Sequence, residues 1–130
     1  MEATDEGDER TLGWLRAVCL AFPEVEETRL QDRPLFVVRH RRFALFNGAA
    51  SPPRPRWARS GRSVHLLTDP QERDALAADE RFTPSPHHGD RGWVAVDPHS
   101  IESEELAELV EAAYRVAAPG SLVATLDRDG

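Results

Sequence analysis

Residues 34–47, PLFVVRHRRFALFN, hold two runs of bulky, β-favouring residues on either side of a polar turn. Phe36 and Val38 belong to the first run and Phe43 and Leu45 to the second, a pattern typical of two paired strands. We place the turn near His40–Arg41, where the glycine that two-residue hairpins prefer is missing. Because so short a connection joins antiparallel strands, this stretch predicts an antiparallel sheet.

Helical patterns lie on both sides of this hairpin. Before it, apolar residues recur every three or four positions and Pro23 follows them, which predicts a helix over Leu12, Leu15, Cys19 and Phe22. After it, a helix is expected over about residues 103–117, ended by Pro119. Its apolar stripe consists of Leu106, Leu109, Val110, Ala113, Tyr114 and Ala117.

Shorter elements fill the rest of the chain. A helix is expected from the capping residue Asp69 to about Ala78, because Pro70 suits a first turn and Glu72 completes a capping box. Strands are expected at 25–30, 62–67 and 92–96, and loops at 48–62 and 82–91. Short connections between strands, with helices packed on the sheet, predict an α+β fold with a curved antiparallel sheet.

The ends of the chain are expected to lie outside this domain. Residues 1–9 carry five acidic residues without periodicity and predict a disordered acidic tail. A single domain is expected over 10–120. Residues 121–130 are expected to form a C-terminal extension that pairs as a strand or trails off.

Length and composition exclude several classes of protein. The chain has 130 residues, 40% of them hydrophobic, which suffices for one domain with its own core. Cys19 is the sole cysteine, which excludes an internal disulfide framework and a multi-cysteine metal site. The apolar runs fall short of the roughly 20 residues of a bilayer span, and the acidic N-terminus is unlike a signal peptide. We therefore expect a cytoplasmic protein with no membrane partner.

Charge is distributed unevenly along the chain, although the formal net charge is −7. Residues 29–62 hold nine Arg and one acidic residue, which gives +8, whereas the segments on either side are acidic. All sixteen basic residues are Arg, a bias that a GC-rich genome also produces. The overall acidity disfavours indiscriminate binding of nucleic acid, but the basic segment is compatible with a local anion site.

Several short strings occur together in a familiar order. They include Pro34-Leu-Phe36, Arg41-Arg42-Phe43-Ala44, Asp69-Pro70, Arg91-Gly92-Trp93-Val94 and Ala113-Tyr114-Arg115. In this order and spacing, over about residues 12–118, the chain resembles the MmcQ/YjbR-like family of small bacterial proteins. The resemblance implies a fold similar to a double-wing nucleic-acid-binding architecture, and members are commonly labelled DNA-binding. It brings no agreed catalytic residues.

Three positions depart from the family's pattern of basic residues. His40-Arg41 stands where the family's hairpin turn usually has Gly followed by Lys. Leu67 stands where a Lys tends to end the strand, and Asp90-Arg91 replaces a basic pair. Basic charge is thus lost at two of the three positions, and the Arg-rich loop offers a replacement.

The basic segment supplies the leading candidate site. Arginines interleaved with an aromatic residue suit phosphate contacts combined with base stacking, as in single-stranded nucleic-acid binding. We therefore expect DNA or another polyanion to bind an Arg-rich hairpin and loop, without enzymatic activity. The alternative is a solvated surface that balances the acidic helices. The candidate residues are Arg39, Arg41, Arg42, Arg54, Arg56, Trp57, Arg59, Arg62 and Arg91.

Two other functions remain open. An apolar cleft near Trp93, Tyr114 and His87 would suit a small apolar ligand, such as a natural product, in a binding or self-protection role. A protein–protein adaptor would instead expose a large apolar patch. We expect no metal and no cofactor, since His87-His88-Gly89-Asp90 lacks further residues at ligand spacing. The helical phase of Cys19 predicts a buried thiol rather than a nucleophile.

Overall fold

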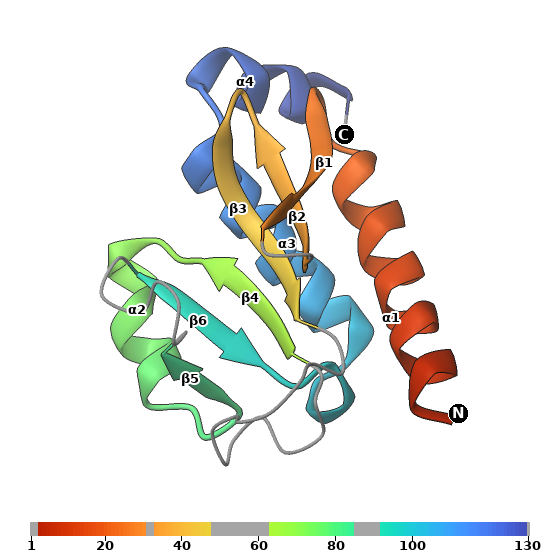
Figure 1. The fold of residues 1–130 in the computed structure, drawn as a ribbon. Helices are drawn as coiled ribbons and strands as arrows, with labels where there is room; N and C mark the ends of the chain where they lie inside the picture. The colour runs from red at the N-terminus through yellow and green to blue at the C-terminus, as the bar shows by residue number, and fades with distance from the viewer. Residues whose placement is uncertain (1–2, 31–32, 48–62, 85–91, 130) are drawn as a thin grey trace.

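The computed structural model describes residues 3–30, 33–47, 63–84 and 92–129, and its elements combine one sheet with four α-helices (Figure 1). This arrangement confirms the expected α+β class. The helices are α1 (Ala3–Leu20), α2 (Pro70–Ala77), α3 (Ser103–Ala117) and α4 (Gly120–Asp129), with a short 3₁₀ turn, η3 (Pro98–Ser100). The strands are β1 (Val25–Leu30), β2 (Arg33–Val38), β3 (Arg41–Asn47), β4 (Ser63–Leu67), β5 (Phe82–Pro84) and β6 (Trp93–Val96).

The six strands form one antiparallel sheet in the order β1-β2-β3-β4-β6-β5. The expected hairpin lies within the sheet, since β2 pairs with β3, and β2 then pairs with β1 and β3 with β4. In Figure 1 the strands β1 to β3 lie in the upper part of the molecule and β4 to β6 in the lower part. The ladder between β3 and β4 runs from Ala44 opposite Leu66 to Asn47 opposite Ser63.

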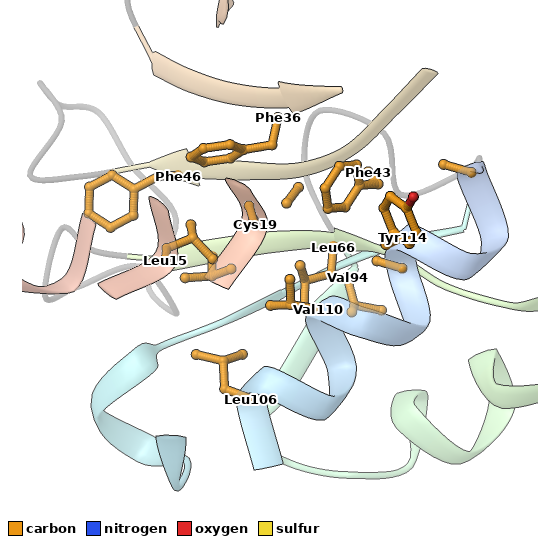
Figure 2. Close-up of a cluster of buried hydrophobic side chains, with 14 of the residues drawn as sticks. Leu15, Cys19, Phe36, Phe43, Phe46, Leu66, Val94, Leu106, Val110 and Tyr114 are labelled. Atoms are coloured by element: carbon orange, nitrogen blue, oxygen red, sulfur yellow. The ribbon is translucent and has the colours of Figure 1, made fainter. Parts of the chain in front are cut away.

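Helices α1 and α3 contribute to the core on one face of the sheet. Leu15 and Cys19 of α1 and Val110 of α3 are fully buried, and they belong to the same cluster as Phe36 and Leu66 of the sheet (Figure 2). Each such side chain contributes roughly 1.5–3 kcal/mol when it is fully removed from water. This cluster therefore holds both helices to the strands.

Local signals account for where two of the helices begin and end. Asp69 caps α2 by accepting a hydrogen bond from the Gln71 backbone N at 2.8 Å, and Pro70 occupies the first turn, as expected. In α3 the apolar stripe is buried, and the helix ends two residues before Pro119. Five residues of the stripe are buried: Leu106, Val110, Ala113, Tyr114 and Ala117.

The structure differs from the sequence-based expectation at both ends of the chain. Helix α1 already begins at Ala3, so it includes most of the segment expected as a disordered tail over 1–9. Residues 121–129 continue α4, whereas a strand or a trailing end was expected. In α4 Leu122 is buried against the core, and Val123 and Leu126 pack partly against it. Apolar contact with the core, at helical spacing, accounts for this helix.

Two smaller differences concern connections. The hairpin turn lies at Arg39–His40, one residue before the expected position, because Val38 is opposite Arg41. Strand β5 lies within the stretch expected as a loop over 82–91, since Phe82 pairs with Val96. The expected loop 48–62 lies outside the described residues. Among the helices of the described part of the chain, none is long and apolar enough to cross a bilayer.

Candidate functional site

The turn between β2 and β3 has an uncommon backbone conformation. Its two central residues, Arg39 and His40, have φ angles of 50° and 70°, although neither is glycine. Positive φ at both central positions is what the type I′ turn, one of the two favoured two-residue hairpin turns, requires. Residues other than glycine adopt it at a cost of about 1–3 kcal/mol each, which the surrounding structure has to offset. The turn is therefore a locally strained feature next to the basic residues.

A β-bulge directly after this turn decides where the arginines point. Phe36 is opposite Ala44, but the next residue, Val37, is opposite Arg42, so Phe43 is an extra residue in β3. Because side chains alternate along a strand, the extra residue places both Phe43 and Ala44 in the core next to α3. The same shift turns Arg42 to the opposite face of the sheet.

The basic residues at the start of β3 line an open groove of about 540 Å³. It lies where β3 extends beyond its ladder with β4, which begins only at Ala44. Leu67 of β4 is paired with Trp93 of β6 on the far side of the groove, and the last turn of α3 also lines it. The lining residues are His40, Arg41, Arg42, Leu67, Trp93, Val116 and Ala117.

The positive charge of this groove comes from Arg41 and Arg42. Arg41 donates a hydrogen bond from Nη1 to the backbone oxygen of Ala117 at 3.3 Å, at the end of α3. Within the residues that the structure describes, neither Arg41 nor Arg42 pairs with a carboxylate, and both side chains are exposed. The groove thus combines two available guanidinium groups with an imidazole and apolar walls.

Other arginines of the molecule are held in ion pairs. Arg39 binds both carboxylate oxygens of Glu24, with N–O distances of 2.6 and 3.0 Å. Arg16 makes a similar pair with Glu27, at 2.6 and 2.8 Å. Arg81 and Arg115 each contact two carboxylates. These four arginines have carboxylate partners, whereas the two arginines of the groove have none among the described residues.

The structure brings together residues from the two sites that the sequence left as alternatives. Arg41 and Arg42 of the expected anion site share the groove with Trp93 of the expected apolar cleft. Tyr114 is fully buried in the core instead of lining the groove, because its ring packs between Phe22 and Phe43. The remaining candidates lie outside the described residues: Arg54, Arg56, Trp57, Arg59, Arg62, His87 and Arg91.

Some groove residues were not expected from the sequence. Val116 and Ala117 close the groove from α3, and Leu67 does so from β4. Their place at the ends of their elements is visible in the sequence, but no motif marks them. His40 was expected only as part of the turn.

The cysteine and the metal expectations concern other parts of the molecule. Cys19 is fully buried in the core, and this burial raises the pKa of its thiol far above the ordinary value. The thiol is therefore unsuited to act as a nucleophile. Among the described residues, no group of three His, Cys, Asp or Glu side chains is arranged to hold a metal ion.

Comparisons with known proteins identify relatives of this chain. The YjbR family model matches residues 20–116. Among solved structures, protein DR2400 of Deinococcus radiodurans, with a DUF419 domain, is 23% identical with a TM-score of 0.66, over 82% of this chain and 78% of that chain. A protein from Pseudomonas syringae is 14% identical with a TM-score of 0.55, over 74% of this chain and 89% of that one. These two likenesses show a shared fold. No curated protein matches the chain.

Proposed function

The chain belongs to the YjbR family, and we propose that it is a non-enzymatic protein that binds nucleic acid through the groove at the start of β3. The observation that carries the proposal is the pair Arg41 and Arg42, exposed in the groove without a carboxylate partner among the described residues. A guanidinium group binds two phosphate oxygens at once, so the pair can hold a phosphodiester backbone.

The position of the pair favours a backbone contact over base reading. Arg41, Arg42 and His40 lie at the tip of a hairpin that extends beyond the β3–β4 ladder. Exposed guanidinium groups at the tip of a hairpin are accessible to the phosphates of a backbone. Since the net charge is −7, binding depends on this local charge and is weak away from it. Contacts to phosphates alone give little sequence preference.

Fluorescence anisotropy with labelled single-stranded and duplex oligonucleotides tests the proposal. The parent protein should bind at low salt, and its affinity should fall steeply between about 50 and 200 mM salt as counterions are released. The double variant Arg41→Gln/Arg42→Gln should lower the slope of log affinity against log salt by up to about 2, since each phosphate contact contributes nearly 1. No detectable binding by the parent at low salt would refute the proposal.

A matched control keeps the change in net charge the same. Arg10 and Arg128 are exposed on α1 and α4, and neither lines the groove. The double variant Arg10→Gln/Arg128→Gln should bind nearly as the parent does. If this control loses as much affinity as the groove variant, the binding reflects net charge and the groove is not the site.

Trp57 remains part of the proposal, as a stacking platform for a base. It lies outside the described residues, between Arg56 and Arg59 in a proline-rich stretch. Trp57→Ala should weaken binding of single-stranded oligonucleotides by roughly 1–3 kcal/mol, the worth of one stacked base, while the free energy of unfolding changes little. A loss of several kcal/mol of stability would show instead that Trp57 packs on the fold.

One observation favours a second candidate, a small organic anion. The groove is also lined by Leu67, Trp93 and Val116, and its volume of about 540 Å³ lies within the range of small-molecule sites. The probe 1-anilinonaphthalene-8-sulfonate combines a sulfonate with aromatic rings and fluoresces when bound. Val116→Trp should block it by filling the groove while the groove arginines remain. Probe binding by both proteins alike would exclude this use of the groove.

An adaptor has less support. Leu20, 44% exposed, is the large hydrophobic residue that stands out from the surface in the described ranges. A single exposed residue of this kind is ordinary and forms no docking patch.

A further inference from the structure

Glu24 lies next to the turn that carries the groove residues. The β1–β2 ladder ends with Val25 opposite Val38, so Glu24 and Arg39 are the next opposed pair beyond it. Both carboxylate oxygens of Glu24 accept hydrogen bonds from the Arg39 guanidinium, at 2.6 and 3.0 Å. The ion pair therefore connects the two segments one residue beyond the last backbone pair of the ladder.

Both partners of this ion pair have an uncommon backbone conformation. Glu24 has a φ of 62°, Arg39 of 50° and His40 of 70°, and these are the non-glycine residues with positive φ in the described part of the chain. Such conformations persist where surrounding contacts over-determine them, and they tend to cluster at functional sites. Here the two strained turns face each other and are joined by the bidentate pair.

The Glu24 turn is in turn anchored to the core. Tyr114 of α3 donates its hydroxyl hydrogen bond to the backbone oxygen of Pro23, at 2.9 Å. The Tyr114 ring also meets Phe43, the bulged residue beside Arg42, edge-on. A continuous series of contacts therefore leads from α3 through Pro23 and Glu24 to the turn that begins at Arg39.

We propose that Glu24 is a positioning residue of the groove, which by binding Arg39 fixes the strained β2–β3 turn so that His40 and Arg41 face the ligand. This inference rests on the proposed function of the groove. Glu24 itself does not line the groove, so it acts through the turn and not by contact with the ligand.

A purely electrostatic effect of Glu24 on ligand affinity and a positioning effect have opposite signs, so the variant Glu24→Gln distinguishes them. If Glu24 influences an anionic ligand only through its charge, its removal strengthens binding, because a repulsive charge disappears and Arg39 is released. If Glu24 positions the turn, its removal weakens binding even though the site becomes more positive. The sign of the change in affinity upon Glu24→Gln therefore separates the two roles.

The test is oligonucleotide anisotropy at low salt with three variants of this pair. Glu24→Gln and Arg39→Gln should each weaken binding by roughly threefold to fivefold, the range that a well-oriented exposed ion pair supports. The exchanged variant Glu24→Arg/Arg39→Glu keeps the net charge and can re-form the pair, so it should recover most of the parent affinity. Tighter or equal binding by Glu24→Gln would overturn the inference.

Arg16 and Glu27 provide the matched control. They form another bidentate Arg–Glu pair, between α1 and β1, and neither residue lines the groove. Glu27→Gln should leave oligonucleotide affinity near that of the parent or raise it slightly. If Glu27→Gln weakens binding as much as Glu24→Gln does, general destabilisation explains the loss and Glu24 has no positioning role.

Amide hydrogen exchange supplies a readout that requires no ligand. Glu24→Gln should accelerate exchange at residues 38–42 while exchange in α3 stays as in the parent, and the exchanged variant should reverse the acceleration. Unchanged exchange at the turn would overturn the inference whatever the affinities are. If the proposed function is wrong, the parent protein itself does not bind oligonucleotides, and the inference about Glu24 is then wrong as well. If only the inference is wrong, the parent protein binds but Glu24→Gln does not weaken binding.

Discussion

The ring of Phe43 meets the ring of Tyr114 edge-on, with centroids 5.7 Å apart and an angle of 82° between the ring planes. Phe43 is the extra residue of the β-bulge, so this contact joins the irregular point of β3 to the last turns of α3. Edge-to-face pairs of this kind add about 0.5–1.5 kcal/mol beyond the burial of their area. The contact therefore stabilises the bulge that turns Arg42 into the groove.

Tyr114→Phe should distinguish the contribution of the Tyr114 hydroxyl to stability from the contribution of its ring. The variant keeps both ring contacts but loses the hydrogen bond to the Pro23 backbone oxygen. We expect the free energy of unfolding to fall by about 0.5–1.5 kcal/mol, the net worth of one hydrogen bond. Tyr114→Ala should cost about 3–5 kcal/mol, since it also leaves a cavity. Urea denaturation measures both, and equal losses would show that the hydroxyl alone matters.

Cys19→Ser should destabilise the protein by about 1–3 kcal/mol, because a hydroxyl would replace a thiol in a fully buried, apolar site. The raised pKa of the thiol also predicts slow reaction with thiol reagents in the native state. Labelling by Ellman's reagent with and without urea compares the two states. Equally fast labelling in both would contradict the buried position. Cys19→Ala, which adds no polar group, is the control for stability.

The sequence predicted the sheet well because its signals are local. The two runs within 34–47 pair as expected, and Asp69 caps α2 as expected. The hairpin turn was placed one residue late because no glycine marks it. Arg39 and His40 take positive φ without glycine, with Arg39 held by Glu24 from another turn. Because Glu24 and Arg39 are 15 residues apart in the sequence, their contact cannot be inferred from the residue pattern of the hairpin.

The groove was harder to predict, since its parts are far apart in the chain. Arg42 and Trp93 share it only because a bulge reverses the side-chain alternation in β3. Strict alternation, counted back from Leu45, would place Arg42 on the core face. Composition identified the basic segment, but which of its arginines are available depends on ion pairs such as Arg39–Glu24, which pattern reasoning does not supply.

The ends of the chain were misjudged for a different reason. Acidic composition suggested a tail over 1–9, although charged residues are compatible with a helix when the helix continues into a packed segment. Helix α1 continues to Leu15 and Cys19, which are buried. In α4 the spacing of Leu122, Val123 and Leu126 is helical. The apolar segment is short, however, and short apolar segments are also compatible with a strand.

The Arg81 network should make stability sensitive to acid. Arg81 contacts Asp79 at 2.8 Å and Glu105 of α3 at 2.9 Å. Its side-chain hydrogen bonds lower the pKa of Asp79 from 3.8 to about 2 and also lower that of Glu105. A lowered pKa stabilises the fold at pH values above the ordinary pKa, and this contribution is lost as the pH falls toward the lowered one.

The measurement is thermal unfolding of the parent and Arg81→Gln between pH 7 and pH 2. The melting temperature of the parent should exceed that of the variant at pH 7, and the two should converge between about pH 4 and pH 2 as both carboxylates are protonated. Added salt should also reduce the difference, because the groups are partly exposed. A difference that persists unchanged to pH 2 would show that Arg81 acts through packing.

Gly92→Ala should test whether backbone conformation or crowding requires glycine at the start of β6. Gly92 has a φ of 88°, and a Cβ there would contact the Arg73 guanidinium, with Cζ at 3.0 Å. Its backbone oxygen accepts a hydrogen bond from the Thr68 backbone N at 2.9 Å, so the conformation is fixed. The crowded group is the end of a flexible side chain that can move aside. We therefore expect the positive φ to dominate, at about 1–2 kcal/mol of lost stability.

Measured in the parent and in an Arg73→Ala background, the cost of Gly92→Ala should agree within about 0.5 kcal/mol, as for independent effects. If Arg73→Ala removes most of the cost, contact with the guanidinium is the reason for the glycine.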